Sequence, residues 1–330
     1  MKVKYLNSDL SHKAVLIGEL LVDFVPSQSN GSVGDSMGFE AHMGGAPANV
    51  AIACHGLGGQ AELLSFVGRD WIGDWLLGQI EKLGLNNSGI ERLVDETTPF
   101  ALVRPDGFDG DKFSISPGWL GASNVSLTHI EAAVRSQIIY FGSCILSNSR
   151  FADKLLASLG TPGGARPLTI FDANIRPSLW EQECLIRPRI QPFLPVSDIL
   201  KMSTEEADLV FGKGDVGQQM KRAHETGVWC VIITDGSASV RYSVAGEQGT
   251  VQPDPMYDRD TTGAGDVLVG SLIAYLLEGS DEASLVLTSL VIRDALMFAT
   301  RVASLGASHR VATNLFSDEK TVEELRRGIH

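Results

Sequence analysis

Residues 260–277 read Asp-Thr-Thr-Gly-Ala-Gly-Asp-Val-Leu-Val-Gly-Ser-Leu-Ile-Ala-Tyr-Leu-Leu, a polar turn with two glycines that runs directly into an apolar segment. An apolar helix of this kind is expected to be buried between other elements rather than to lie on the surface. The first N–H groups of a helix have no partner within it, and the helix dipole adds positive potential there. Because glycines let a ligand approach the backbone closely, this stretch predicts an anion-binding helix start inside a layered fold.

Asp266 falls in the first turn of that predicted helix. A carboxylate beside an anion hole can take the proton from an attacking alcohol while a phosphoryl group is transferred. The alternative is an ordinary helix start in which Asp266 only complements the dipole. The preceding Asp-Thr-Thr and the buried type of helix favour the catalytic interpretation, with Asp266 as base and Gly263, Ala264 and Gly265 as the anion hole.

Upstream of this stretch, short apolar runs alternate with segments of helical pattern. The runs are continuous rather than alternating, as in strands that are covered on both faces. The predicted strands are 14–18, 63–67, 138–141, 168–172, 198–201 and 230–234. The predicted helices are 46–57, 73–83, 127–136, 151–159, 204–211 and 216–226, followed by 263–278, 283–305 and 318–328. This alternation predicts an α/β fold around a mostly parallel, doubly wound sheet.

Two stretches do not fit the alternation. Residues 19–43 and 97–116 have the pattern of strands joined by turns, with a Pro-Asp-Gly turn signal at 105–107. Both can belong to a small β subdomain that lies against the main sheet. Because no repeat or long linker interrupts the chain, residues 1–330 are expected to form a single domain.

Composition limits the partners of this protein. The formal net charge of −13 makes nucleic acid and anionic membranes poor partners. No apolar run reaches the roughly 18 residues of a membrane span, and the N-terminus lacks a signal-peptide pattern. The four cysteines are not closely spaced in pairs, which favours free buried thiols over disulfides or zinc. We therefore expect a cytoplasmic protein.

A second polar block, Gly-Gly-Ala-Pro-Ala-Asn-Val-Ala, occupies residues 44–51. Gly44 and Gly45 allow a close approach of a ligand, and the amide of Asn49 offers both donors and an acceptor. Sugar hydroxyls need both kinds of partner. The alternative is a turn before a helix, with Asn49 as its cap.

Two further blocks follow predicted strands, where ligands bind in open α/β sheets. In Asp-Ala-Asn-Ile-Arg (172–176), alternate polar residues of an extended segment would point the same way, and Arg176 could pair with a phosphate. The alternative there is a surface ion pair. In Lys-Met-Ser-Thr-Glu-Glu (201–206), Glu206 could hold magnesium through water or form a capping box with Ser203, and both roles can coexist.

One more turn, Thr234-Asp235-Gly236-Ser237, follows the predicted strand 230–234. A turn at this place could contact a nucleotide phosphate. The chain has no Walker A loop and no dinucleotide fingerprint, so a Rossmann-type dehydrogenase is disfavoured.

These blocks, in this order, resemble the ribokinase-like, or phosphofructokinase-B, family of carbohydrate kinases. Residues 260–266 are similar to its C-terminal signature, and 44–51 with 56–73 to its N-terminal one; the resemblance extends over about residues 15–317. Within the family, 18–26 and the Asp-x-Asn-x-Arg-x-x-Leu-Trp of 172–180 look most like fructokinases.

The resemblance implies a three-layer α/β/α sandwich with a small β-sheet lid formed by about 19–43 and 97–120. It implies transfer of the ATP γ-phosphoryl group to a sugar hydroxyl, with Mg²⁺ and potentially K⁺ as cofactors and pairing of lids into a homodimer. The implied sugar-binding residues are Asp23, Gly44, Gly45, Asn49 and Arg176. The implied nucleotide-binding residues are Thr234, Gly236 and Lys201, and the implied metal-binding residues are Glu206 and Asp260.

The sequence also departs from the fructokinase pattern. The lid segment 116–122 lacks the usual Arg and Ala-Asp pair, and Val311-Ala312 stands where Gly-Ala is usual near the adenine and cation loops. Because of the matching motifs at 18–26 and 172–180, fructose is the first expectation for the substrate. The alternatives are 2-keto-3-deoxygluconate, ribose or a riboside, or a non-catalytic relative that binds sugar as a regulator.

Overall fold

The computed structural model describes residues 4–27, 38–104, 113–121, 128–160, 166–236, 238–253, 263–280, 285–306, 315–316 and 319–326. Within these residues the main sheet has nine strands in the order β14-β13-β12-β11-β10-β9-β2-β5-β6. The strands are β2 (Ser11–Ile17), β5 (Ala61–Gly68), β6 (Ile90–Leu93), β9 (Ser136–Gly142), β10 (Leu168–Asp172), β11 (Ile199–Ser203), β12 (Cys230–Asp235), β13 (Ser239–Val244) and β14 (Glu247–Val251). All neighbouring strands from β12 to β6 run parallel, and β13 and β14 are antiparallel.

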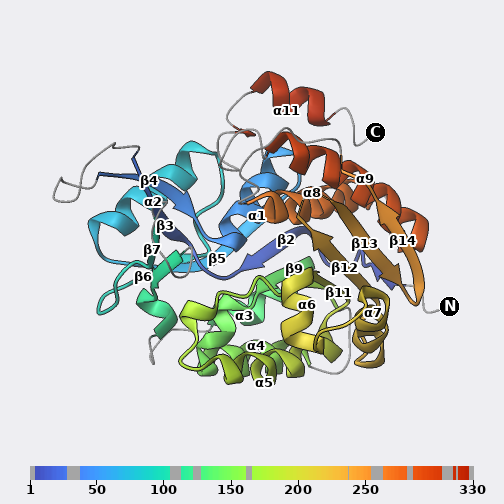
Figure 1. Ribbon diagram of the computed structural model, residues 1–330. Coiled ribbons are helices and arrows are strands. Elements are labelled where there is room, and N and C mark those ends of the chain that lie inside the picture. The colour runs from blue at the N-terminus through green and yellow to red at the C-terminus, as the bar shows by residue number, and fades with distance from the viewer. Residues whose placement is uncertain are drawn as a thin grey trace.

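Helices cover both faces of this sheet (Figure 1). One face packs against α1 (Ala46–Gly56), α2 (Trp71–Lys82), α8 (Ala264–Glu278) and α9 (Ser289–Gly306). The other packs against α3 (Thr128–Ala133), α4 (Ser149–Leu159), α5 (Ile186–Ile190), α6 (Thr204–Phe211) and α7 (Val216–Glu225). Helix α11 (Glu319–Arg326) lies above α9 in Figure 1. The predicted three-layer sandwich with a mostly parallel sheet is confirmed.

The strands at the centre of the sheet explain the continuous apolar runs. Every residue of β9 and β10 is buried, because side chains on each face enter a separate hydrophobic core.

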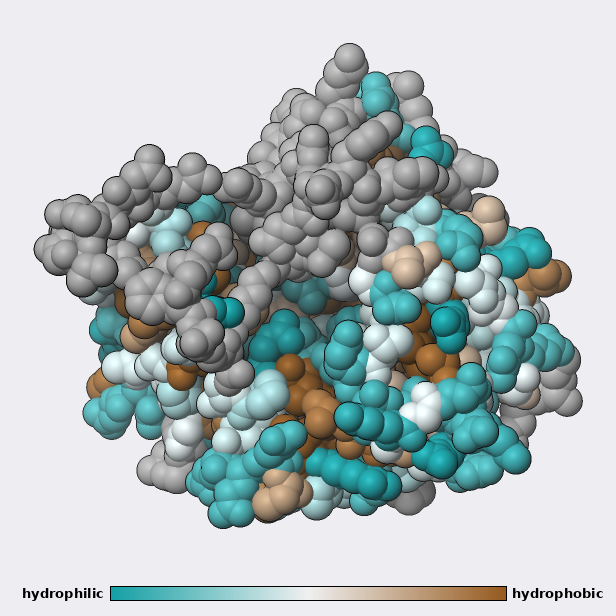
Figure 2. All heavy atoms as spheres, viewed as in Figure 1, coloured by the Kyte–Doolittle hydropathy of each residue, from teal (hydrophilic) through white to brown (hydrophobic). Residues whose placement is uncertain are grey.

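On the face in Figure 2, hydrophilic side chains cover most of the described surface, and hydrophobic ones lie in narrower areas between them. Among the described residues, no helix is long and apolar enough to cross a membrane.

A second sheet of four strands has the order β4-β3-β7-β8. Its strands are β3 (Leu21–Pro26), β4 (Phe39–Gly44), β7 (Phe100–Val103) and β8 (Phe113–Ser116). It lies to the left of the main sheet in Figure 1. Asp23 lies on β3 and Gly44 ends β4, so this sheet carries two of the predicted sugar-binding residues.

Two local expectations were wrong, and one hairpin was not predicted. The predicted helix 283–305 is divided: β15 (Leu285–Leu287) pairs with β1 (Lys4–Leu6), and α9 begins only at Ser289. The predicted helix 127–136 ends early, since Ser136 already belongs to β9. The hairpin of β13 and β14 was not predicted; its two-residue turn, Ala245-Gly246, has positive φ at both residues, as tight hairpin turns require.

Short helices fill the connections between the larger elements. The stretch after β10 contains η3 (Pro177–Leu179), η4 (Glu183–Leu185), α5 and η5 (Gln191–Val196), and η1 (Gly118–Gly121) and η2 (Cys144–Ser147) follow β8 and β9. Trp119 of η1 is fully buried, with its ring 4.8 Å from that of Phe66. This tryptophan, which the sequence places in the suspected lid, belongs to the core.

Candidate active site

The first turn of α8 is open on the side of its leading glycine. Gly263 is the N-cap with φ +82°, a left-handed conformation that glycine adopts without strain. A Cβ built there would meet no atom of the described residues within 4 Å, and one built on Gly265 would lie 3.0 Å from Lys201 Nζ. Gly263 has no side chain to cap the helix, and no side chain of the described residues caps it either, which leaves the first amides of α8 for a ligand to bind. Asp260 lies outside the described residues.

Asp266 is held by a hydrogen bond that joins two predicted blocks. Asn49 Nδ2 of α1 donates to Asp266 Oδ2 at 2.9 Å, across 217 residues of sequence. Asn49 is not the cap of α1, because Gly45 takes that position and Asn49 N donates to its carbonyl. Asn49 Oδ1 is buried without a hydrogen-bond partner among the described residues. That oxygen can accept a hydrogen bond from a sugar hydroxyl.

The surroundings of Asp266 set its basicity. Burial raises the pKa of its carboxyl, while the hydrogen bond from Asn49 and the positive charges of Lys201 and Arg176 lower it. The net effect is a pKa above the ordinary value of an aspartate. A carboxylate that holds a proton more tightly than usual is better suited to accept one from an alcohol.

Asp23 of the small sheet is influenced by the charge of Arg176. Burial raises the pKa of Asp23 to about 6, and the positive charge of Arg176 opposes this shift. The guanidinium of Arg176 lies over the Phe113 ring of β8, 5.9 Å from its centroid. A Cβ on Gly44 would lie 2.2 Å from Asp23 Oδ2, so a larger residue there would displace the Asp23 carboxylate.

The segment after β10 is not extended as predicted. Asn174 has φ +32°, which interrupts the alternation of side chains between Asp172 and Arg176. Asparagine tolerates this conformation better than most residues. The Asn174 carbonyl accepts a hydrogen bond from Ser143 Oγ at 3.4 Å, which ties this turn to the end of β9.

Lys201 and Asp172 form a buried ion pair. Its Nζ lies 3.1 Å from Asp172 Oδ1, and the two residues are register partners on β10 and β11. Burial raises the pKa of Asp172 to about 7, and Lys201 opposes that shift. Lys201 therefore has its charge balanced by Asp172, and its Nζ lies next to Gly265 in the first turn of α8.

Glu206 forms the capping box that its position allowed. Ser203 Oγ accepts from Glu206 N, and Glu206 Oε2 accepts from Ser203 N, which completes the capping box of α6. Glu206 Oε1 accepts from Ile175 N at 2.8 Å. Each oxygen keeps a second lone pair, so a water held by a metal can still bind. Among the described residues, no three His, Cys, Asp or Glu side chains form a metal-binding cluster.

Thr234 and Gly236, the residues predicted to contact the nucleotide, lie at the end of β12, the strand next to β11. Thr234 of β12 pairs in register with Ser203 of β11, and its hydroxyl donates to the Met202 carbonyl at 3.4 Å. Gly236 has φ +51°, and a Cβ built on it would meet none of the described residues within 4 Å. Thr234 therefore lies beside the strand end that leads into the capping box of Glu206.

Sequence reasoning missed Glu19. This residue follows β2 and is only 4% exposed, and its Oε1 accepts a hydrogen bond from Ala46 N at 3.2 Å. Burial raises the pKa of Glu19 to about 7, against the positive charge of Arg176. An acidic residue in the apolar stretch just before Asp23 was the signal that could have revealed it.

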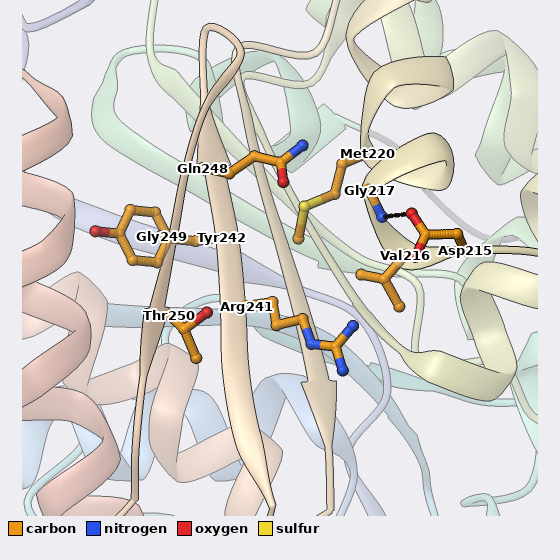
Figure 3. Close-up of a pocket in the computed structure, with 9 residues that line it drawn as sticks. All are labelled: Asp215, Val216, Gly217, Met220, Arg241, Tyr242, Gln248, Gly249 and Thr250. Atoms are coloured by element: carbon orange, nitrogen blue, oxygen red, sulfur yellow. Dashed lines mark hydrogen bonds between the residues drawn. The ribbon is translucent and has the colours of Figure 1, made fainter.

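The pocket in Figure 3 lies elsewhere and contains none of the predicted site residues. It lies between α7 and the hairpin of β13 and β14, and Asp215 Oδ1 there accepts from Gly217 N as the cap of α7. Its lining residues are Asp215, Val216, Gly217, Met220, Arg241, Tyr242, Gln248, Gly249 and Thr250.

The sandwich, the open helix start and the aspartate beside it define an α/β phosphotransferase. Residues 11–319 match the pfkB family of carbohydrate kinases, so the chain belongs to that family. It is 28% identical over 320 residues to a protein of Arabidopsis thaliana described as probable fructokinase-4, covering 95% of this chain and 96% of the relative. The family resemblance is thereby confirmed, and the protein is a sugar kinase.

Solved structures share this fold. A fructokinase of Vibrio cholerae, determined with fructose, ADP and a potassium ion, has a TM-score of 0.81 at 20% identity, covering 97% of this chain and 99% of its own. An aminoimidazole riboside kinase of Salmonella enterica has a TM-score of 0.79 at 20% identity, covering 95% and 99%. Because kinases for different substrates share the sandwich, the substrate has to be argued from the site.

Proposed function

We propose that the protein is an ATP-dependent fructokinase that converts D-fructose to fructose 6-phosphate. The observation that carries the proposal is the hydrogen bond from Asn49 to Asp266, which brings the sugar-binding block and the base into contact. The fructokinases among its relatives support fructose as the sugar.

In the proposed mechanism the protein positions two substrates and stabilises charge. The sugar lies among Asp23, Gly44, Gly45, Asn49 and Arg176, and one of its hydroxyls approaches Asp266. Asp266 accepts the proton of that hydroxyl as its oxygen bonds to the γ-phosphorus of ATP, and the bond to the β-phosphate oxygen breaks to release ADP. The amides of the turn Gly263, Ala264 and Gly265 receive the negative charge on the phosphoryl oxygens.

Lys201, Thr234 and Gly236 are proposed to contact the nucleotide. Lys201 lies beneath the anion hole, and Thr234 lies beside β11 at the carboxyl edge of the sheet. Magnesium bound with ATP would neutralise charge on the phosphates. Glu206 fits an outer position toward this ion through water, and Asp260 is proposed as a further metal-binding residue. A potassium ion, as in the Vibrio cholerae fructokinase, is proposed as a second cation.

The four-stranded sheet is proposed to act as the lid of a single 1–330 domain, with segments of about 19–43 and 97–120. Asp23 on β3 and the contact of Phe113 on β8 with Arg176 support this role, because both link the small sheet to the proposed sugar-binding residues. We further propose that lids pair into a homodimer, which light scattering would detect. A cytoplasmic location suits the cysteines, which are free among the described residues.

A coupled ADP-release assay across a panel of sugars tests the proposal. We expect the highest kcat/KM with fructose, and ³¹P NMR should show phosphorylation at the 6-position. A higher kcat/KM with 2-keto-3-deoxygluconate, ribose or a riboside would transfer the assignment to that substrate. ATP binding without ADP release for any sugar would instead indicate a regulatory relative.

A further inference from the structure

Glu19 is a buried acid that the mechanism above does not use. It lies between β2 and β3 and is 4% exposed. Its Oε1 accepts from Ala46 N at 3.2 Å, and its Oε2 has no hydrogen-bond partner among the described residues. A buried carboxylate with an unsatisfied oxygen is costly unless nearby charge compensates it.

The start of α1 explains why an acid is useful at this place. Gly45 is the N-cap and has no side chain, Pro47 has no N–H, and the first turn contains no acidic residue. Glu19 supplies the missing negative charge and acceptor from a distant part of the chain. The backbone is equally close, since a Cβ on Gly45 would lie 2.3 Å from the Glu19 carbonyl oxygen.

Two charged side chains of the site act on this carboxyl. The positive charge of Arg176 lowers the pKa of Glu19, and the negative charge of Asp266 raises it. From β9 and the turn after it, Tyr140 and Cys144 also face Glu19, and both hold their protons because burial raises the pKa of each. Arg176 is thus the positive charge that can balance Glu19.

We propose that Glu19 is a positioning residue: its ionised carboxylate holds the first turn of α1 and the guanidinium of Arg176 in the arrangement that binds the sugar. The contacts form a continuous path. Glu19 binds the start of α1, Asn49 lies on the next turn, and Asn49 holds Asp266. This inference rests on the proposed sugar kinase activity, since it concerns the affinity of the same site.

The decisive variant is Glu19→Gln, which keeps the size and the acceptor oxygen for Ala46 N and removes only the charge. We expect the KM for the sugar to rise about 10-fold at pH 8, the size of one lost charge-assisted interaction. We expect kcat to change less than about 3-fold and the KM for ATP to stay constant, because the nucleotide residues are on other strands.

The pH dependence separates charge from shape. Because burial raises the pKa of Glu19 to about 7, the wild type carries this charge at pH 8 and has largely lost it at pH 6. The ratio of KM between Glu19→Gln and wild type should therefore shrink at pH 6. Asp23, whose pKa is about 6, titrates in both proteins and cancels in the ratio.

Glu62→Gln is the matched control, because Glu62 is an acid of β5 that pairs with Lys13. Its KM values should equal those of wild type. Equal sugar KM values for Glu19→Gln and wild type at pH 8 overturn the inference. A fall in kcat of similar size, together with a rise in the KM for ATP, overturns it as well. If the wild type phosphorylates no sugar, the proposed function fails, and the inference fails with it.

Discussion

Helices α1 and α8 both begin at a glycine, but the surroundings of the two helix starts differ. Each has a glycine of positive φ as its N-cap, Gly45 at +100° and Gly263 at +82°, and neither glycine can offer a capping side chain. At α8 none of the residues that the structure describes fills the space beside the glycine; at α1 the backbone and carboxylate of Glu19 fill it.

Because of this difference, we expect the start of α8 to bind a ligand and the start of α1 to hold other residues of the site in position. An open helix start can receive a phosphoryl group because its amides and dipole are unopposed. A start that already faces a carboxylate cannot receive a second anion, but it can hold a side chain such as Asn49 in place. The predictions below test whether the two helix starts have these different roles.

The largest expected effect comes from Asp266→Asn, which removes the base from the open helix start. We expect kcat to fall about 10²–10⁴-fold, the usual contribution of a general base. Calorimetry should show ATP binding close to that of wild type, since the amides of the turn remain. A turnover near that of wild type would remove Asp266 from this role.

Alanine substitutions at the two glycines compare the helix starts directly. Gly45→Ala puts a Cβ 2.3 Å from a backbone oxygen at a strained φ, so we expect a loss of about 3 kcal/mol in the free energy of unfolding. Gly263→Ala meets open space, so only conformational strain of about 1 kcal/mol is expected. Urea unfolding measures both, and equal losses would contradict the contrast between a filled and an open start.

Glu19→Gln should raise stability at high pH. A carboxyl whose pKa is raised in the folded state binds its proton more tightly there, so folding loses stability as the pH rises from 4.5 toward 7. Above pH 7 the full cost applies, and removing the charge should recover up to about 3 kcal/mol. Unfolding at pH 8 and at pH 4.5 measures this, with Glu62→Gln as control; no gain at pH 8 contradicts a buried, ionised Glu19.

The sequence predicted the parts of this fold whose patterns are local. Continuous apolar runs such as 168–172 became central strands with the same bounds, and the helix of 204–211 was equally well defined by its capping box. The strand Leu285–Leu287 was missed because its partner, Lys4–Leu6, lies at the other end of the chain. Pairing over such a distance leaves no periodic signal within either segment.

The sequence predicted the site residues that belong to local motifs. It did not predict the contacts between residues that are distant in the sequence. Asp266, Asn49 and Arg176 were chosen from their own neighbours in sequence. The hydrogen bond between Asn49 and Asp266, and the support of α1 by Glu19, depend on how two sheets and two helices come together. Nothing within residues 18–26 alone shows that Glu19 faces a helix start.

The smallest expected effect is a shift in the pH dependence of turnover, and it tests the link between the two helices. Asn49→Ala removes the hydrogen bond that lowers the pKa of Asp266, so that pKa should rise further. A general base must be ionised, so the acid limb of kcat at saturating sugar should move to higher pH than in wild type. The KM for the sugar should also rise, whereas kcat at high pH should approach that of wild type. An acid limb that stays in place would show that Asn49 does not act on the base, and would leave the two helix starts as independent parts of the site.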